Sequence, residues 1–366
     1  MKKALVVDWL DKYGGAERVI ATFEKIFSFD VTYTLVNIME QDNLRKIYPK
    51  GTEVLKETRL KKLNKKFRVV FFSFQHFIKT IKIDRDIDLI LSSSHAVAKG
   101  VRKSRPNQLH ISYFQARNFN YIWSDYKLYF GAFRHLLYPM VHYLRKEDIR
   151  QGQNPDYIIS NSVFVQQWVR EKYGRESTVI YPPVDLEPFH LETEKEDYFV
   201  AVGRLVYVKR FDIAIKAFNK SGKKLIVIGD GDQARYLKKM AGPNIIFTGF
   251  LDSSEVHHYV SKARGFIQTG IEGFGIAPIE AQACGTPVIA YADGGVVETV
   301  KPGETGVFFE AQTVESLGRA LEMFESTSFN AHAIRTHAMR FSTDRFEKEI
   351  TSFVTEKWRA HNQHFS

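Results

Sequence analysis

The sequence predicts an α/β protein of two doubly wound domains that face each other across a cleft. Short apolar runs alternate with helical segments along the chain, as in parallel sheets covered on both faces. The chain has 366 residues, which exceeds the size at which one hydrophobic core stops growing. Pro182-Pro183 and the charged stretch 192–197 separate two such series of runs. We therefore expect one domain at residues 1–190 and another at 191–341.

The first series opens with a strand at Ala4–Val7, a loop containing Gly14 and Gly15, and a helix at 16–26. This is a strand-loop-helix unit. Further strands of this domain are expected at 31–36, 87–91, 109–114, 157–160 and 178–181.

The second series is more regular. Its strands are expected at 198–203, 224–229, 245–249, 265–269, 287–291 and 306–309, with helices between them. A helix at about 342–366 follows, and its periodicity leaves open whether it packs back on the first domain.

The composition indicates a folded globular protein with anionic partners. The chain has 44% hydrophobic and 26% charged residues, which is typical of folded globular proteins. Lys and Arg outnumber Asp and Glu by 52 to 42, which favours phosphates, nucleic acid or an acidic membrane surface as partners. The single cysteine, Cys284, excludes an internal disulfide. No apolar stretch has the length of a signal peptide core or a membrane span, so we expect a cytoplasmic location.

Residues 59–82 predict a basic amphipathic helix. The apolar positions at steps of three and four are Leu60, Leu63, Phe67, Phe71, Phe74, Ile78 and Ile81. A helix that buries one face on the sheet is the simpler interpretation. The additional apolar residues Val70, Phe72 and Phe77 favour a second one, in which the helix binds an anionic membrane at the inner face of the cell membrane. Nucleic-acid binding is less favoured, because no recognised module accompanies the charges.

Ligands of open parallel sheets bind beyond the carboxyl ends of the strands, so polar residues there are candidates. Arg204 follows the strand at 198–203, and Lys209 and Arg210 lie five and six positions later. These side chains and the helix that begins nearby are suited to hold a diphosphate. A solvated basic turn explains the same residues equally well. Gly229, in Gly229-Asp-Gly-Asp232, follows the next strand, where a plain turn is the alternative to a close approach by ligand.

The loop after the strand at 265–269 is rich in glycine and ends in a helix. Glu272 lies on this loop and Glu280 in the helix, and both carboxylates can accept hydrogen bonds from hydroxyl groups of a sugar or a ribose. The N–H groups of Phe274, Gly275 and Ile276 are expected to face a phosphate or hexose. The alternative is that both acids only complement the helix dipole.

In the first half, His95 ends the run Ser92-Ser-Ser-His95 after the strand at 87–91. It is placed to donate a hydrogen bond to a sugar hydroxyl, although many such histidines are structural. The loop from Asp8 to Gly15 has the same two interpretations, with Gly14 and Gly15 leaving space for a ligand.

With these residues in place, the sequence resembles retaining glycosyltransferase family 4, whose members have the GT-B fold of two Rossmann-like domains. The motifs that carry the resemblance are Val202-Gly-Arg204, Lys209, Gly229-Asp-Gly-Asp232, Thr248-Gly-Phe250, Glu272 to Glu280, Cys284-Gly-Thr-Pro-Val288, Gly294-Gly-Val-Val-Glu298 and Gly303-Glu-Thr-Gly306. In the first half Asp8-Trp-Leu, Gly14-Gly-Ala-Glu-Arg18 and 92–101 look like bacterial O-antigen and capsule mannosyltransferases. Where those relatives often have Cys-His-Thr-Pro, this chain has Tyr113-Phe-Gln-Ala-Arg117.

The resemblance implies roles for the candidate residues. The first domain would bind the acceptor and the second the nucleotide-sugar. Arg204 and Lys209 would neutralise the donor diphosphate, Glu272 would bind the donor sugar, Glu280 the ribose, and His95 would face the reacting sugar. The base would lie near Phe250 and Leu251. No metal or other cofactor is expected.

The implied reaction transfers a hexose, mannose from GDP-mannose as first choice, to a glycan or polyprenyl-linked saccharide, with the anomeric configuration kept. Cell-surface polysaccharide synthesis is the expected setting. Two alternatives remain: a nucleotide-sugar 2-epimerase of the same fold, and a catalytically silent membrane-associated scaffold that retains the nucleotide site.

Overall fold

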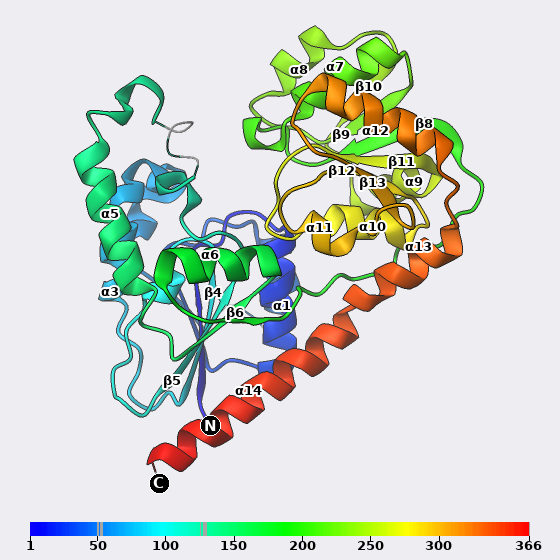
Figure 1. The fold of residues 1–366 in the computed structure, drawn as a ribbon. Coiled ribbons are helices and arrows are strands. Elements are labelled where there is room, and N and C mark those ends of the chain that lie inside the picture. The colour runs from blue at the N-terminus through cyan, green and yellow to red at the C-terminus, as the bar shows by residue number, and fades with distance from the viewer. Residues whose placement is uncertain (50, 52–53, 125, 127–129, 366) are drawn as a thin grey trace. The chain divides into compact units, whose positions relative to one another are not determined.

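The chain divides into two compact units, residues Met1–Pro183 with Phe346–Ser366 and residues Val184–Arg345. The computed structural model describes residues 1–365 except 50, 52–53, 125 and 127–129. The units are coloured from blue to green and from green to orange in Figure 1, where the red C-terminal segment belongs to the first unit. The division falls after Pro183, a few residues before the boundary expected near residue 190.

The first unit contains a parallel sheet in the order β3-β2-β1-β4-β5-β6-β7. The strands are β1 (Lys3–Val7), β2 (Val31–Thr34), β3 (Leu55–Glu57), β4 (Leu89–Ser94), β5 (Leu109–Phe114), β6 (Tyr157–Ser160) and β7 (Thr178–Val179). Strand order reverses between the neighbours β1 and β4. In doubly wound sheets such a reversal opens a crevice at the carboxyl ends of the two strands.

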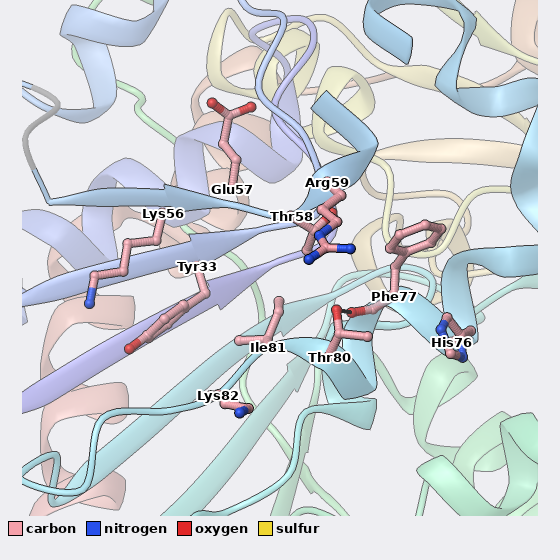
Figure 2. Close-up of a pocket in the computed structure, with 10 residues that line it drawn as sticks. All are labelled: Tyr33, Lys56, Glu57, Thr58, Arg59, His76, Phe77, Thr80, Ile81 and Lys82. Atoms are coloured by element: carbon pink, nitrogen blue, oxygen red, sulfur yellow. Dashed lines mark hydrogen bonds between the residues drawn. The ribbon is translucent and has the colours of Figure 1, made fainter. Parts of the chain in front are cut away.

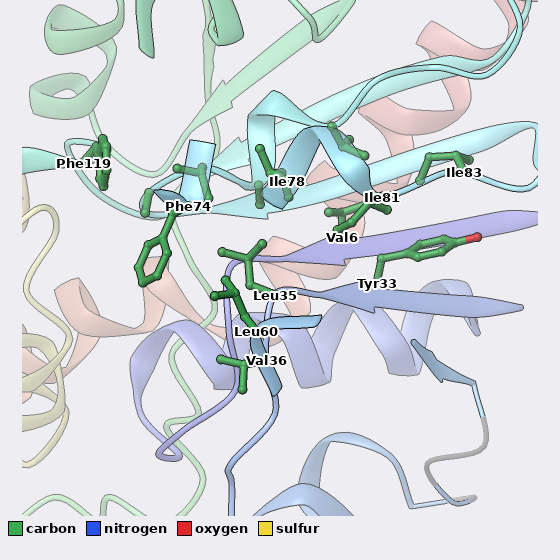
Figure 3. Packing of buried hydrophobic residues seen from close by; sticks show 14 of the residues in the cluster. Val6, Tyr33, Leu35, Val36, Leu60, Phe74, Ile78, Ile81, Ile83 and Phe119 are labelled. Carbon is green, nitrogen blue, oxygen red and sulfur yellow. The ribbon is translucent and has the colours of Figure 1, made fainter. Parts of the chain in front are cut away.

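Helices cover both faces of this sheet. They include α1 (Gly15–Phe27), α2 (Gln41–Ile47), α3 (Phe74–Thr80), α5 (Tyr138–Gln151), α6 (Val163–Tyr173) and α14 (Thr343–Phe365). On one face, Leu60, Phe74 and Ile78 pack against Val6 and Tyr33 of the sheet (Figure 3). On the other face, Phe346, Ile350 and Val354 of α14 join the core formed by α1, α2 and the strands. The last helix is thus part of the first unit's core.

The second unit repeats the same winding. Its parallel sheet has the order β10-β9-β8-β11-β12-β13, so its reversal lies between β8 and β11. The strands are β8 (Glu196–Val202), β9 (Leu225–Ile228), β10 (Ile245–Gly249), β11 (Ala263–Gln268), β12 (Val288–Tyr291) and β13 (Gly306–Phe309). The helices include α7 (Phe211–Ser221), α8 (Ala234–Met240), α9 (Ser253–Lys262), α10 (Ile276–Ala283), α11 (Val296–Thr299), α12 (Val314–Ser326) and α13 (Ala331–Ala338). The predicted fold class, two doubly wound α/β units, is confirmed.

The single amphipathic helix predicted at 59–82 is wrong. Residues Arg59–Ser73 form the 3-10 segment η1, which is interrupted by non-helical backbone at Asn64 (φ 46°) and Val70. The α-helix α3 begins only at Phe74 and ends at Thr80. Leu60, Phe67, Phe74 and Ile78 are buried, as the periodicity predicts, whereas Leu63, Val69 and Phe72 are exposed. Among the described residues, no helix combines the length and hydrophobicity that crossing a membrane requires.

Candidate functional site

Three predicted residues of the second unit lie at its strand-order reversal. Arg204 and Lys209 follow β8, with Lys209 ending the short 3-10 turn η5 (Tyr207–Lys209), and Glu272 follows β11. Since β8 and β11 are the neighbours between which strand order reverses, these side chains flank the crevice position of a doubly wound sheet.

Lys209 and Glu272 contact each other directly through Nζ and Oε1. Gln268 Nε2 also donates to Glu272 Oε1 at 3.4 Å and to the carbonyl of Gly270 at 3.1 Å, which fixes the start of the loop. Burial and the neighbouring Arg204 guanidinium lower the pKa of Lys209 to about 8. The Glu272 carboxylate acts in the opposite direction and favours the protonated amine. Arg204 itself is exposed and forms no ion pair within the described part of the chain.

Close backbone packing explains Gly270 in this loop and Gly295 in the loop after β12. A Cβ added at Gly270 would lie 2.7 Å from Lys209 Cα, and Thr269 Oγ1 donates to the Lys209 carbonyl at 2.9 Å. The loop after β12 packs on the other side, because Gly295 N donates to the Glu272 carbonyl at 2.9 Å. A Cβ at Gly295 would lie 2.4 Å from Phe274 Cα. Three loops therefore hold one another, and Lys209 and Glu272 lie on two of them.

Gly229 has a structural role that accounts for it without a ligand. Its φ is +133°, and a Cβ would lie 2.0 Å from the Gly203 carbonyl oxygen. Only glycine fits this turn after β9, because the turn lies directly against the backbone of Gly203, next to Arg204. The turn thus places the Arg204 loop, whichever ligand binds.

The segment from Phe274 to Glu280 joins the loop to α10. Gly275 caps the helix with left-handed backbone (φ 95°), and Ile276 is its first residue. The Phe274 side chain is buried and packs on Phe341 at a ring distance of 5.7 Å, so only its backbone is suited to meet a ligand. Glu280 is half-buried in the second turn of α10.

Phe250 and Leu251 follow β10, the edge strand of the sheet. Phe250 is 85% exposed, which is exceptional for an aromatic side chain, and Leu251 is half-buried. An exposed ring beyond a strand end is suited to stack on a base.

In the first unit, Asp8 and His95 follow β1 and β4 and meet at the reversal of that sheet. The buried Asp8 carboxylate accepts the backbone N–H groups of His95, Ala96, Val97 and Ala98 at 2.6 to 2.9 Å. It also lies 3.1 Å from His95 Nδ1. With Nδ1 held by Asp8, the other ring nitrogen, Nε2, is the one suited to meet a ligand.

The Trp9 and His95 rings are nearly perpendicular, with their centroids 4.4 Å apart. Together, Asp8 and Trp9 fix the imidazole from two sides.

The glycine loop before α1 adds a carboxylate that the sequence analysis did not select. Gly14 N donates to Glu17 Oε2 at 3.0 Å, and Gly15 is the first residue of α1. Burial raises the pKa of Glu17, while the charge of nearby His95 lowers it. A glutamate three positions after a helix cap is a known capping pattern, so Gly14 and Glu17 could have been paired from sequence.

A pocket of about 500 Å³ lies elsewhere in the first unit, between the edge strand β3 and α3 (Figure 2). Its lining residues are Tyr33, Lys56, Glu57, Thr58, Arg59, His76, Phe77, Thr80, Ile81 and Lys82. Its charges are mainly positive, and none of the predicted site residues lines it.

Two doubly wound units in one chain are characteristic of the GT-B fold. Sucrose-phosphate synthase from Thermosynechococcus elongatus superposes with a TM-score of 0.76 and 16% identity over 98% of this chain and 100% of that one. Anabaena HepE in complex with UDP and glucose gives a TM-score of 0.71 and 17% identity, over 97% and 100%. At these identities the likeness shows the GT-B fold.

The family resemblance is confirmed by sequence as well. Residues 185–340 match the family described as Glycosyl transferases group 1. A GDP-mannose-dependent phosphatidylinositol monomannoside mannosyltransferase of Mycolicibacterium smegmatis is 30% identical over 33% of this chain and 37% of its own. The O-antigen chain mannosyltransferase RfbU of Salmonella typhimurium is 26% identical over 55% of this chain and 60% of its own. The matches span about a third of the first relatives' own length.

Proposed function

We propose that the chain is a retaining glycosyltransferase that moves a hexose from a nucleoside-diphosphate sugar to a glycan or polyprenyl-linked acceptor. The observation that carries the proposal is the contact between Lys209 and Glu272, with Arg204 on the same loop as Lys209, at the strand-order reversal of the second unit. Residues that the motifs relate to a diphosphate and a sugar are adjacent in the fold.

The charges suit this chemistry. The exposed Arg204 guanidinium and the Lys209 ammonium offer positive charge to the bridging diphosphate of a donor, where negative charge grows as the glycosidic bond breaks. Glu272 offers carboxylate oxygens to sugar hydroxyls. The preorganised side chains supply the electrostatic stabilisation, so the proposal requires no metal or other cofactor.

The remaining roles follow the same logic. Phe250 and Leu251 would meet the base, Glu280 the ribose, and the backbone of Phe274, Gly275 and Ile276 the phosphate or hexose. In the first unit His95, held by Asp8, would face the reacting sugar, and the loop at Gly14 and Gly15 would leave room for it.

Mannose from GDP-mannose is the first choice of donor, because several similar proteins are mannosyltransferases named as GDP-mannose-dependent. O-antigen or other cell-surface polysaccharide synthesis is the proposed setting, since one relative is an O-antigen chain mannosyltransferase. We propose a cytoplasmic location, with a peripheral position at the inner face of the cell membrane as the more specific hypothesis.

The donor is tested by thermal shift with GDP-, UDP-, ADP- and dTDP-sugars. A donor at 100 times its Kd stabilises by about 2.7 kcal/mol, so one nucleotide family should raise the Tm clearly. Arg204→Ala should lose this shift, while Arg319→Ala, an exposed arginine on α12, should keep it. No shift with any donor, or an equal shift in Arg204→Ala, would refute the donor site.

A product assay separates the two alternative functions. Transfer should yield a glycoside with retained anomeric configuration and only in the presence of acceptor. Free epimerised sugar without acceptor would indicate a 2-epimerase, whereas donor binding without any turnover would indicate a silent scaffold.

A further inference from the structure

Two segments of the first unit expose large apolar side chains. In η1, Val69 is 74% exposed and Phe72 and Leu63 are also exposed. In the segment that leads into α5, Leu136 is 77% exposed, and Phe133 is exposed as well. Single exposed apolar residues are common, whereas several that come together on one part of a protein are typical of an interaction surface. We call these five side chains and the cations around them the basic apolar surface.

The two segments are fixed to each other, although about 60 residues separate them in sequence. The Phe71 ring lies 5.8 Å from that of Phe130. Behind them, Gln75 Nε2 donates to the Leu144 carbonyl at 2.9 Å, and Gln151 Nε2 donates to the Gln75 carbonyl at 2.8 Å. The exposed residues of η1 and of the α5 region therefore belong to one rigid part of the unit.

The charge around these residues has one sign. Residues 59–82 contain eight Lys and Arg and no Asp or Glu, and residues 130–146 contain three and none. Arg68 pairs with Asp11 and Lys79 with Glu147. The other six cations of 59–82 have no ion-pair partner in the described part of the chain; they are Arg59, Lys61, Lys62, Lys65, Lys66 and Lys82. Arg59 and Lys82 also line the pocket in Figure 2, so the positive charge continues into it.

The exposed side chains belong to a segment whose neighbouring residues are firmly packed in the core. Leu60, Phe67 and Phe74 are buried and anchor the segment on the sheet, while Val69 and Phe72 between or beside these anchors stay outside. These buried residues hold the segment in one conformation before any partner binds. Little conformational entropy is therefore lost when the exposed side chains bind.

We propose that the basic apolar surface docks on an anionic lipid membrane, with Val69, Phe72 and Leu136 entering the headgroup region and the unpaired lysines lying at the lipid phosphates. An excess of unpaired cations around aliphatic and aromatic side chains fits a lipid surface, which needs no fixed hydrogen-bond pattern. The surface is independent of the donor site, and it would bring a lipid-linked acceptor to the proposed enzyme.

The test is flotation of the full chain with vesicles of phosphatidylcholine, with and without phosphatidylglycerol. Binding should require the anionic lipid and weaken with salt. The variant Lys61→Gln, Lys62→Gln, Lys65→Gln, Lys66→Gln should lower the partition coefficient by about tenfold or more, because each cation near an anionic leaflet contributes to binding. The control changes four exposed lysines of the second unit: Lys216→Gln, Lys220→Gln, Lys238→Gln, Lys239→Gln.

A second pair of variants tests the apolar part. Val69→Ser with Phe72→Ser should weaken binding, whereas Met323→Ser, an exposed residue of α12, should not. Equal binding of the lysine variant and its control, or equal binding to vesicles without anionic lipid, overturns the proposal. Binding to an acidic protein or nucleic acid without vesicle binding does so too. Donor thermal shifts, measured without vesicles, report on the proposed function separately.

Discussion

The charge of Lys209 depends on what lies beside it. Burial and Arg204 lower its pKa to about 8, while the contact with Glu272 favours the protonated form. A bound diphosphate would add negative charge and hold the proton more strongly. Only the ammonium form attracts a diphosphate, so donor capture by the free protein should weaken as pH rises above this value.

We predict that kcat/KM for sugar transfer falls as pH rises above about 8, because Lys209 then loses its proton in the free enzyme and the Glu272 carboxylate moves this loss to higher pH. Lys209→Arg should remove this alkaline fall while lowering the overall rate, since a guanidinium stays charged but differs in shape. Lys216→Arg on α7 is the control and should keep the wild-type profile. The measurement is the pH dependence of kcat/KM for the three proteins; an unchanged alkaline fall in Lys209→Arg would contradict the assignment.

The contact between Asp8 and His95 could not be predicted from the sequence, although each residue could be selected separately. The position of Asp8 after a strand and that of His95 after another were both predictable from apolar runs. Their contact was not, because the N–H groups that Asp8 accepts lie 87 to 90 residues away and the order of strands decides which ends are neighbours. For the same reason Lys209 and Glu272 could be selected separately but not paired.

At the scale of elements, long apolar strands were predictable and short or polar ones were not. The strand β3, Leu-Lys-Glu at 55–57, has a single apolar residue and lies at the sheet edge, so its sequence carries no strand pattern. In η1, a period of three to four fits both 3-10 and α-helix, and the backbone break at Asn64 has no counterpart in the apolar spacing. Periodicity therefore gave the buried face of this segment but not its geometry.

The interlocked loops of the second unit make a prediction at this scale. Gly270→Ala would place a Cβ 2.7 Å from Lys209 Cα, so it should destabilise the protein by about 1–3 kcal/mol and weaken the donor thermal shift. Gly318→Ala is the matched control, because nothing lies within 4 Å of its Cβ and the residue is inside α12. It should stabilise by about 0.5–1 kcal/mol. Urea unfolding measures both, and no loss in Gly270→Ala would show that the loops do not hold one another.

At the scale of the whole molecule, the first unit is completed by the end of the chain. Its strands and helices up to Pro183 form a core that also needs Phe346, Ile350 and Val354 of α14, while residues Val184–Arg345 fold into the other unit. The apolar spacing of the last helix was visible in the sequence, but its partners were not, because they lie more than 150 residues away. The stability of the first unit therefore depends on a segment that follows the second unit in the sequence.

Phe346→Ala should destabilise the first unit selectively. Phe346 is fully buried, with its ring 5.7 Å from Phe23 and 6.0 Å from Tyr113, and truncating a buried phenylalanine costs about 3–5 kcal/mol. Hydrogen exchange should become faster in β1, β4 and β5 and stay slow in β8 and β9, whose core residues belong to a separate cluster. Phe353→Ala, a partly buried residue of the same helix, should have a smaller effect. Adding the nucleotide found by thermal shift should slow exchange around β8 and β11 in all three proteins. Equally faster exchange in both sheets of Phe346→Ala would mean that the units unfold together and that α14 stabilises the whole chain.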